Sequence, residues 1–253
     1  MLVLITPTGA RQAQFDLCSR WMNQQTYNGN VLWIIIDDCN PKTTDKITDT
    51  FRLNWTIEKV YPVPVWSGIN TQGRNMKAGI DTLINNHNLK DVEAIFIIED
   101  DDYYRPVYLD RMITHFDNHS LLGEKNTIYY NVVYRRWVTN PNTQHASLFQ
   151  TAFTIDAIPY LQKCYSQKFM DATLWYTVTN KKLFNDGDLA IGIKGMPGRG
   201  GIGAGHSKAF AMQEDFNLRF LRSKIGETDA KLYEGYFRDY RGSQHPLLAR
   251  RRY

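Results

Sequence analysis

Short apolar runs alternate with segments of helical spacing in the first half of the chain. The apolar runs cover residues 1–6, 31–36 and 94–98. Runs of this kind are typical of parallel strands that are covered on both faces of a sheet. After them, apolar residues recur at helical spacing in residues 11–25, from about residue 75, and after Pro106. Three strand-to-helix units in residues 1–116 predict an α/β fold, with a mostly parallel sheet flanked by helices.

The second half of the chain is less regular. We expect strands at 127–138, 147–155 and 189–193, and a helix starting near residue 171. We find no linker and no internal repeat, so residues 1–253 are expected to form one domain. A hydrophobic fraction of 43% with 22% charged residues excludes a disordered or low-complexity chain.

The chain carries no sequence signal for a membrane or for export. Its longest apolar run, 31–36, is far shorter than the ~20 residues that cross a bilayer. The first residues lack the basic region and long apolar stretch of a signal peptide. Cys18, Cys39 and Cys164 are odd in number and lack metal-site spacing. We therefore expect a reduced, cytoplasmic compartment, which for a viral protein is the host cytoplasm.

The net charge of +4 is concentrated at the end of the chain. Residues 236–253 contain five arginines and one acid, Asp239, interleaved with aromatic residues. Such a basic, aromatic tail could follow a polyanion, with arginines on phosphates and rings stacked on bases. The alternative is a solvated terminus.

Two acidic clusters, 37–38 and 99–102, directly follow the strands 31–36 and 94–98. Ligands of parallel sheets bind outside the carboxyl ends of the strands. Four consecutive carboxylates raise one another's pKa, and a divalent cation relieves that repulsion. Mg²⁺ or Mn²⁺ takes carboxylate and phosphate oxygens, so the second cluster predicts a metal–diphosphate site. The alternative is an acidic loop in solvent.

A glycine-rich segment, 192–205, formally contains the dinucleotide-binding fingerprint at 198–203. That fingerprint belongs in the first strand-helix unit with an acid about 20 residues later, so we reject it here. A loop that closes over phosphates through backbone N–H groups is the preferred interpretation, and a plain flexible loop is the alternative. His206 follows this segment, and Asp171 lies at a predicted helix start, where an acid is often only a cap.

The order of these segments resembles the GT-A nucleotide-sugar glycosyltransferases, particularly the inverting family 2 type, from Leu2 to about Ser207. The densest match is Ile97–Leu109, which resembles the DxD metal motif and its trailing helix. The other segments that carry the resemblance are 4–11, 34–38, 73–79, 153–161 and 169–175. Two positions depart from the family pattern, because Glu99 replaces the usual first Asp and Met170 replaces the Glu of the catalytic-base motif.

The resemblance assigns roles to individual residues of this sequence. It implies a metal shell of Glu99, Asp101, Asp102 and His206 around Mn²⁺ or Mg²⁺. It implies a donor-nucleotide site of Thr6, Pro7, Arg11, Asp38, Arg74, Asn75 and Asp100. It makes Asp171 the catalytic base. The glycine-rich loop that we expect to close over phosphates contributes Arg199, Gly200 and Gly201. Residues 1–116 are then the nucleotide-sugar half, 117–235 the acceptor and catalytic half, and 236–253 a basic tail.

These roles imply a metal-dependent inverting transfer of a sugar from a nucleotide diphosphate sugar, with a UDP-sugar as the family's commonest donor. Charge and size favour DNA as the acceptor, through a hydroxymethylated base, as in glycosyltransferases of viral DNA. The residues that would contact nucleic acid are Arg135, Arg136, Trp137, Arg250, Arg251 and Arg252. A saccharide or protein acceptor is the alternative within this class. A nucleotidyltransferase or a non-catalytic nucleic-acid-binding protein is the alternative outside it.

Overall fold

The computed structural model describes residues 1–47, 51–63, 71–198 and 212–242, with backbone only for 237–242. Its centre is a seven-stranded sheet in the order β10-β6-β9-β4-β1-β2-β3. The strands are β1 (Leu2–Thr8), β2 (Val31–Asp37), β3 (Trp55–Val60), β4 (Ala94–Ile97), β6 (Leu121–Glu124), β9 (Thr151–Phe153) and β10 (Lys181–Phe184).

Most strand pairs of this sheet are parallel. β1 pairs in parallel with β2 on one side and β4 on the other, and β3 extends the parallel part beyond β2. β9 is inserted antiparallel between β4 and β6, whereas β10 is again parallel to β6. The mostly parallel α/β fold expected from the sequence is confirmed.

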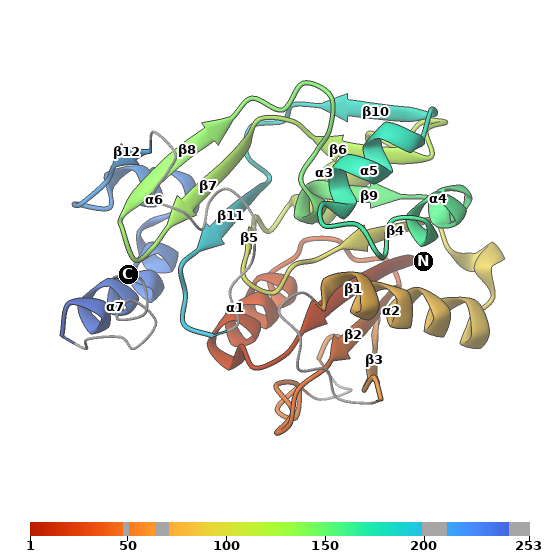
Figure 1. Cartoon of the computed structure of the whole chain (residues 1–253), viewed down its shortest axis with the longest axis horizontal. Helices are drawn as coiled ribbons and strands as arrows, with labels where there is room; N and C mark the ends of the chain where they lie inside the picture. The colour runs from red at the N-terminus through yellow and green to blue at the C-terminus, as the bar shows by residue number, and fades with distance from the viewer. Residues whose placement is uncertain (48–50, 64–70, 199–211, 243–253) are drawn as a thin grey trace.

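Helices cover both faces of the sheet, as Figure 1 shows. Residues of β1 alternate between the two apolar clusters, with Leu2 and Leu4 in one and Val3 and Ile5 in the other. The first cluster includes α1 (Gln12–Asn23), and the second includes α2 (Gln72–Asn86). The shorter helices are η1 (Leu89–Asp91), α3 (Tyr108–Ile113), η2 (Leu148–Gln150), η3 (Ile155–Ala157), α4 (Ile158–Gln162) and α5 (Met170–Thr177).

A second sheet of five strands lies beside the first, in the order β12-β8-β7-β11-β5. Its strands are β5 (Tyr103–Tyr104), β7 (Thr127–Asn131), β8 (Arg136–Asn140), β11 (Ala190–Lys194) and β12 (Gln213–Glu214). β5 follows the acidic cluster 99–102 directly and pairs antiparallel with β11. The acidic cluster therefore lies in the segment that connects β4 of the first sheet to β5 of the second.

Several elements differ from the sequence expectation. The segment 127–138 forms the antiparallel pair β7–β8, and 147–155 forms η2, β9 and the start of η3. The short strands β3, β6 and β10 were not expected, because they are only four to six residues long and carry polar residues. Two further helices, α6 (Arg219–Ile225) and α7 (Glu227–Gly242), lie beside the second sheet.

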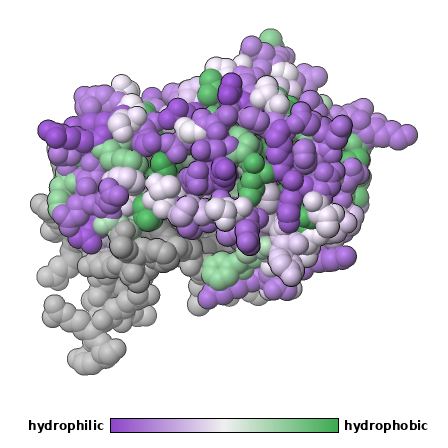
Figure 2. Space-filling model, turned by 90° about the horizontal axis from the view of Figure 1, so that it is seen from above, coloured by the Kyte–Doolittle hydropathy of each residue, from purple (hydrophilic) through white to green (hydrophobic). Residues whose placement is uncertain are grey.

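The surface seen in Figure 2 is mostly hydrophilic where it is described, with apolar residues in small separate groups. Among the helices that the structure describes, none combines the length and the apolar character needed to cross a membrane.

Candidate active site

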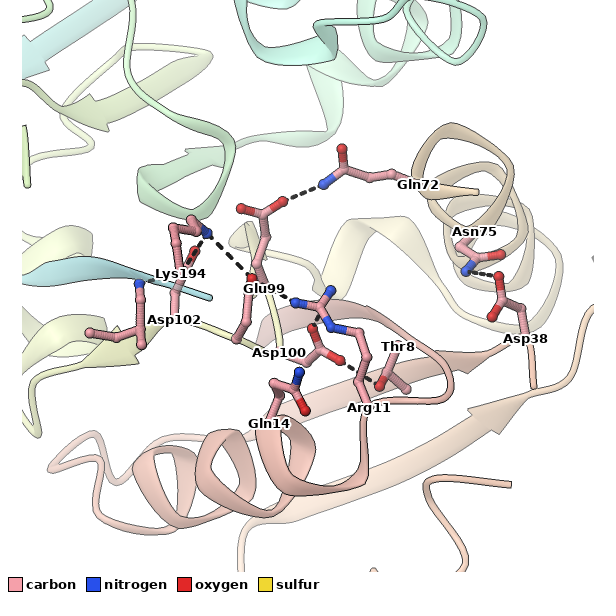
Figure 3. Close-up of polar contacts among 12 residues, drawn as sticks. Thr8, Arg11, Gln14, Asp38, Gln72, Asn75, Glu99, Asp100, Asp102 and Lys194 are labelled. Atoms are coloured by element: carbon pink, nitrogen blue, oxygen red, sulfur yellow. Dashed lines mark hydrogen bonds and ion pairs between the residues drawn. The ribbon is translucent and has the colours of Figure 1, made fainter. Parts of the chain in front are cut away.

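The carboxyl ends of β1, β2 and β4 bring the predicted motifs together (Figure 3). Thr8, at the end of β1, donates a hydrogen bond to Asp100 Oδ2 over 2.6 Å. Asn75, in the first turns of α2, donates to Asp38 Oδ2 over 3.0 Å. Parallel pairing aligns these strand ends on one edge, so residues from distant parts of the sequence form one site.

The acidic cluster offers a set of metal ligands. One oxygen each from Glu99, Asp101 and Asp102 can be chosen so that all three lie within 4.8 Å of one another. Asp102 is 1% exposed, and its Oδ2 has no hydrogen-bond partner among the described residues. A buried carboxylate oxygen without a partner is costly, and a divalent cation would satisfy it. The residues present therefore fit Mg²⁺ or Mn²⁺.

Two cations already contact this cluster, the partly buried Arg11 and the buried Lys194. Arg11, in the turn before α1, places one guanidinium nitrogen 3.0 Å from Asp100 Oδ1 and another 2.6 Å from Asp101 Oδ2. Lys194, at the end of β11, places its Nζ 2.7 Å from Asp102 Oδ1 and 3.5 Å from Asp101 Oδ2. The two cations offset half of the charge of the four carboxylates.

Burial dominates the acid–base chemistry of the cluster. It raises the pKa of Asp100 to about 6, against the lowering effect of Arg11. Burial also raises the pKa of Glu99. Lys194 lowers this pKa and Asp101 and Asp171 raise it, and the result is about 6. Burial alone would lower the pKa of Lys194, but Asp101, Asp102 and Glu99 raise it. Both cations thus stay charged, and Asp100 and Glu99 take up protons at a higher pH than ordinary carboxylates do.

The predicted nucleoside residues lie around this edge. Thr6 is fully buried and its hydroxyl accepts a hydrogen bond from Trp33, whereas Pro7 beside it is half-buried. Arg74 is half-buried in the first turn of α2. Asp38 is buried, and its carboxylate reaches Asn75 across the site.

Two glycines permit close approaches at this edge. A Cβ on Gly9 would lie 2.0 Å from Asp38 Oδ1, so only glycine leaves room for that carboxylate. A Cβ on Gly73 would lie 1.9 Å from the carbonyl oxygen of Tyr165, so glycine is also needed where α2 starts. The first approach leaves room for the Asp38 carboxylate that Asn75 contacts, and the second lets the start of α2 pack against the backbone at Tyr165.

Asp171 lies in the first turn of α5 and is half-buried. Burial raises its pKa, although the backbone N–H groups of the helix start and His145 lower it. Its charge also raises the pKa of Glu99, which places Asp171 within electrostatic reach of the acidic cluster. The predicted base and Glu99 therefore influence each other's protonation.

Some predicted residues lie outside the described part of the chain. These are His206, Arg199, Gly200, Gly201, Arg250, Arg251 and Arg252. The chain just before residue 199 does approach the site, because Gln14 of α1 donates a hydrogen bond to the carbonyl of Pro197 over 2.6 Å.

The predicted nucleic-acid residues of the second sheet have partners within the protein. Arg136 forms an ion pair with Glu214 at 2.6 Å, and Arg135 donates to the carbonyl of Phe216. Trp137 stacks on Phe220 with ring centroids 3.6 Å apart. These side chains join β8 to β12 and α6, and their placement does not test a contact with nucleic acid.

The sequence did not predict two polar residues of the site, Lys194 and Gln72. Gln72, the first residue of α2, donates a hydrogen bond to Glu99. The signal for Lys194 was a lysine directly after an apolar strand, at a position that a strand covered on both faces rarely gives to a cation. A buried lysine needs a partner, and the acidic cluster supplies it.

No family model matches the sequence, and no curated protein matches it either. Solved structures of S. aureus TarS do match the fold. A crystal structure of TarS aligns with a TM-score of 0.56 at 13% identity, covering 76% of this chain and 36% of TarS.

Structures of TarS residues 1–349 in complex with UDP or with UDP-GlcNAc each align with a TM-score of 0.54 at 14% identity. The UDP complex covers 76% of this chain and 60% of that one. The UDP-GlcNAc complex covers 100% of this chain and 76% of that one. The chain thus spans between about a third and three quarters of the TarS chains it matches. At these identities the likeness shows the fold, which is a GT-A-like α/β fold.

Proposed function

We propose that the protein is an inverting, metal-dependent glycosyltransferase that uses a nucleotide diphosphate sugar, with a UDP-sugar as the donor. The observation that carries the proposal is the buried cluster of Glu99, Asp101 and Asp102 at the end of β4, with Asp171 within electrostatic reach. The GT-A-like fold and the UDP and UDP-GlcNAc complexes of TarS support the same donor class.

The donor would lie across the carboxyl ends of β1, β2 and β4. Pro7, Asp38, Arg74 and Asn75 border the place for the nucleoside, with Thr6 beneath them. Arg11 is held against Asp100 and Asp101, where its charge faces the same edge as the diphosphate. Arg199, Gly200 and Gly201 are proposed to close over the phosphates.

Glu99, Asp101 and Asp102 would hold the cation, with His206 completing the shell. The chemistry such a cation supplies when bound is Lewis-acid neutralisation of the charge on the departing diphosphate. Gln72 donates to Glu99 and so orients that carboxylate.

Asp171 is proposed as the general base. It would accept the proton of the acceptor hydroxyl as that oxygen forms a bond to the anomeric carbon from the face opposite the diphosphate. The bond from the anomeric carbon to the phosphate oxygen breaks at the same time, and the nucleoside diphosphate leaves with the electron pair. The configuration is therefore inverted in one step.

The acceptor we propose is a hydroxymethylated base in DNA, flipped out of the duplex to expose its hydroxyl. The excess of arginines in residues 236–253 supports a polyanionic acceptor. A saccharide or protein acceptor remains the alternative for the same chemistry.

The test is a donor screen. The protein is incubated with Mn²⁺ and a panel of UDP-, GDP- and dTDP-sugars, and the release of nucleoside diphosphate by slow hydrolysis is measured. Hydrolysis of one donor class by the wild type, lost in Asp101→Ala, supports the proposal. No release from any donor contradicts it. Pyrophosphate release from a nucleoside triphosphate would instead indicate a nucleotidyltransferase.

A further inference from the structure

We propose that Lys194 is a built-in counter-cation of the metal site, which keeps the affinity for a free divalent cation low until a nucleoside diphosphate is present. The inference rests on the proposed metal site, and it deepens the proposed function by assigning an order of binding. Metal and nucleotide would then enter the site together.

The position of Lys194 is fixed by the second sheet. β11 pairs in parallel with β7 through Gly192, Ile193 and Lys194, which sets the register of the strand. The backbone N–H of Ile193 donates to Asp102 Oδ1 over 2.9 Å, and Lys194 Nζ reaches the same oxygen over 2.7 Å. Two successive residues of β11 therefore hold one carboxylate.

Two aromatic rings also lie near the ammonium group of Lys194. Lys194 Nζ lies 5.6 Å from the ring centroid of Phe149 and 6.0 Å from that of Tyr129. Lys194 is 6% exposed, so water can do little to screen its charge. The rings and the two carboxylates together define a site for a cation, and the protein's own lysine fills it. Figure 3 shows Lys194 beside Asp102.

This arrangement opposes a second cation at the same carboxylates. Asp101 and Asp102 are two of the three candidate metal ligands, and Lys194 forms an ion pair with both. A divalent ion bound there lies within a few ångströms of the ammonium, where like charges in a buried site repel strongly. Metal affinity depends on the net charge of the ligand set, which Lys194 reduces.

A bound nucleoside diphosphate would offset the repulsion between Lys194 and a divalent cation. Its phosphates bring negative charge to the edge of the cluster and supply further oxygen ligands for a divalent ion. Lysine has a flexible stem of four carbons and three donor positions, so Lys194 can turn from the carboxylates towards a phosphate oxygen. The repulsion between ammonium and metal is then offset by the phosphates that both cations share.

The test measures Mn²⁺ binding without any nucleotide, by the electron paramagnetic resonance signal of free Mn²⁺. Lys194→Met should bind Mn²⁺ about tenfold or more tightly than the wild type, because one buried positive charge is gone. Lys194→Arg keeps the charge and should bind as weakly as the wild type. Lys182→Met is the matched control. Lys182 Nζ lies 2.6 Å from Asp117 Oδ2, and neither residue belongs to the acidic cluster.

UDP supplies the second arm. The wild type should bind Mn²⁺ much more tightly with UDP than without it, and the difference between wild type and Lys194→Met should shrink. If Lys194→Met does not fold, Lys194→Gln, which keeps a hydrogen-bond donor for Asp102, replaces it. Melting temperatures with and without Mn²⁺ give an independent readout, and Mn²⁺ should raise that of the Lys194 variant more than that of the wild type.

Equal Mn²⁺ affinity in the wild type and the neutral variants would overturn the inference, as would no binding in any of them. If the ion pairs of Lys194 only stabilise the fold, the neutral variants should have a lower melting temperature and unchanged Mn²⁺ affinity. Failure of the proposed function looks different. Tighter Mn²⁺ binding in Lys194→Met with no donor hydrolysed would keep Lys194 as the counter-cation of a metal site that serves another reaction.

Discussion

The side-chain amide of Asn75 donates a hydrogen bond to Asp38 Oδ2 over 3.0 Å, and so links the start of α2 to the end of β2. Gly9 lies against the other oxygen of the same carboxylate, and Asp38 itself is fully buried. The carboxylate is therefore held in one orientation before any nucleotide arrives. A group ordered in advance loses little entropy on binding, which suits a residue that recognises a nucleoside.

We predict that Asp38→Ala lowers the affinity for UDP about tenfold to a hundredfold. A hydrogen bond to a charged group contributes about 1.5–3 kcal/mol, and the variant removes it. Isothermal titration calorimetry with UDP and Mn²⁺ measures the change. Asp16→Ala is the control, since Asp16 is an exposed residue of α1 bonded to Gln12. Unchanged UDP affinity in Asp38→Ala would place the nucleoside elsewhere.

Asp171→Asn should lower transfer by about 10²–10⁴-fold while leaving donor binding nearly intact. The base works only when deprotonated, and burial raises the pKa of Asp171, so activity should fall as pH drops through that raised pKa. Turnover measured from pH 4 to 8, beside calorimetry for the donor, tests both points. Wild-type turnover in Asp171→Asn would mean that another group is the base.

Asp186 and Asp188 are the next candidates for the base, and the structure gives each a cationic partner. Asp186 accepts from Arg111 and lies 3.0 Å from His115 Nε2, whereas Asp188 lies 2.5 Å from Lys224 Nζ. Burial raises the pKa of Asp186, but the hydrogen bonds and charges of His115 and Arg111 together outweigh that effect and lower the pKa overall. A carboxylate with a lowered pKa is a weak proton acceptor, so Asp171 remains the better assignment.

Asp101→Ala and His206→Ala should each weaken metal-dependent binding of the donor. Asp101 is one of the three grouped candidate ligands, and His206 is proposed to complete the shell. Titration of Mn²⁺ with the donor present, followed by calorimetry, gives the apparent metal affinity. If both variants show the metal dependence of the wild type, the metal assignment fails.

The stability of the metal-free protein should fall as pH rises from about 4 to about 6. Burial raises the pKa of Asp100 to about 6, so the folded protein binds a proton there that the unfolded chain releases near pH 4. Stability from this group is thus present below pH 4 and lost through pH 6, by about 3 kcal/mol at most. Melting temperatures across this range should fall less steeply in Asp100→Asn than in the wild type.

Deleting residues 250–253 should weaken binding to duplex DNA and make it less sensitive to salt. Each phosphate contact contributes a log–log slope of roughly −0.9, and the deletion removes three arginines, so the slope should become shallower by up to about 3. Affinity for DNA at several salt concentrations measures this, with donor hydrolysis as the unchanged control. No DNA binding by the full chain at low salt would remove DNA as the acceptor.

The sequence predicted the parallel core because periodicity is a local signal. The apolar run before Asp37 and the acids after Ile98 needed no knowledge of distant residues. β3 was missed because it mixes polar and apolar residues at the edge of the sheet. The Lys194–Asp102 pair could not be predicted either, since it depends on the pairing of β5 with β11 and on residues 92 positions apart.

The long distance in sequence between pairing strands also affects how the chain folds. β1 pairs with β2 on one edge, but its other edge stays unpaired until β4 is present, where Leu2 lies opposite Ala94. β4 in turn pairs with β9, where Ile95 lies opposite Phe153. During synthesis the apolar strand β1 therefore has an open edge until residues 94–97 emerge, and an open apolar edge invites pairing with other chains. Pairing between strands that are distant in sequence also slows folding. The chain should therefore be most prone to aggregation when only its first half has been synthesised.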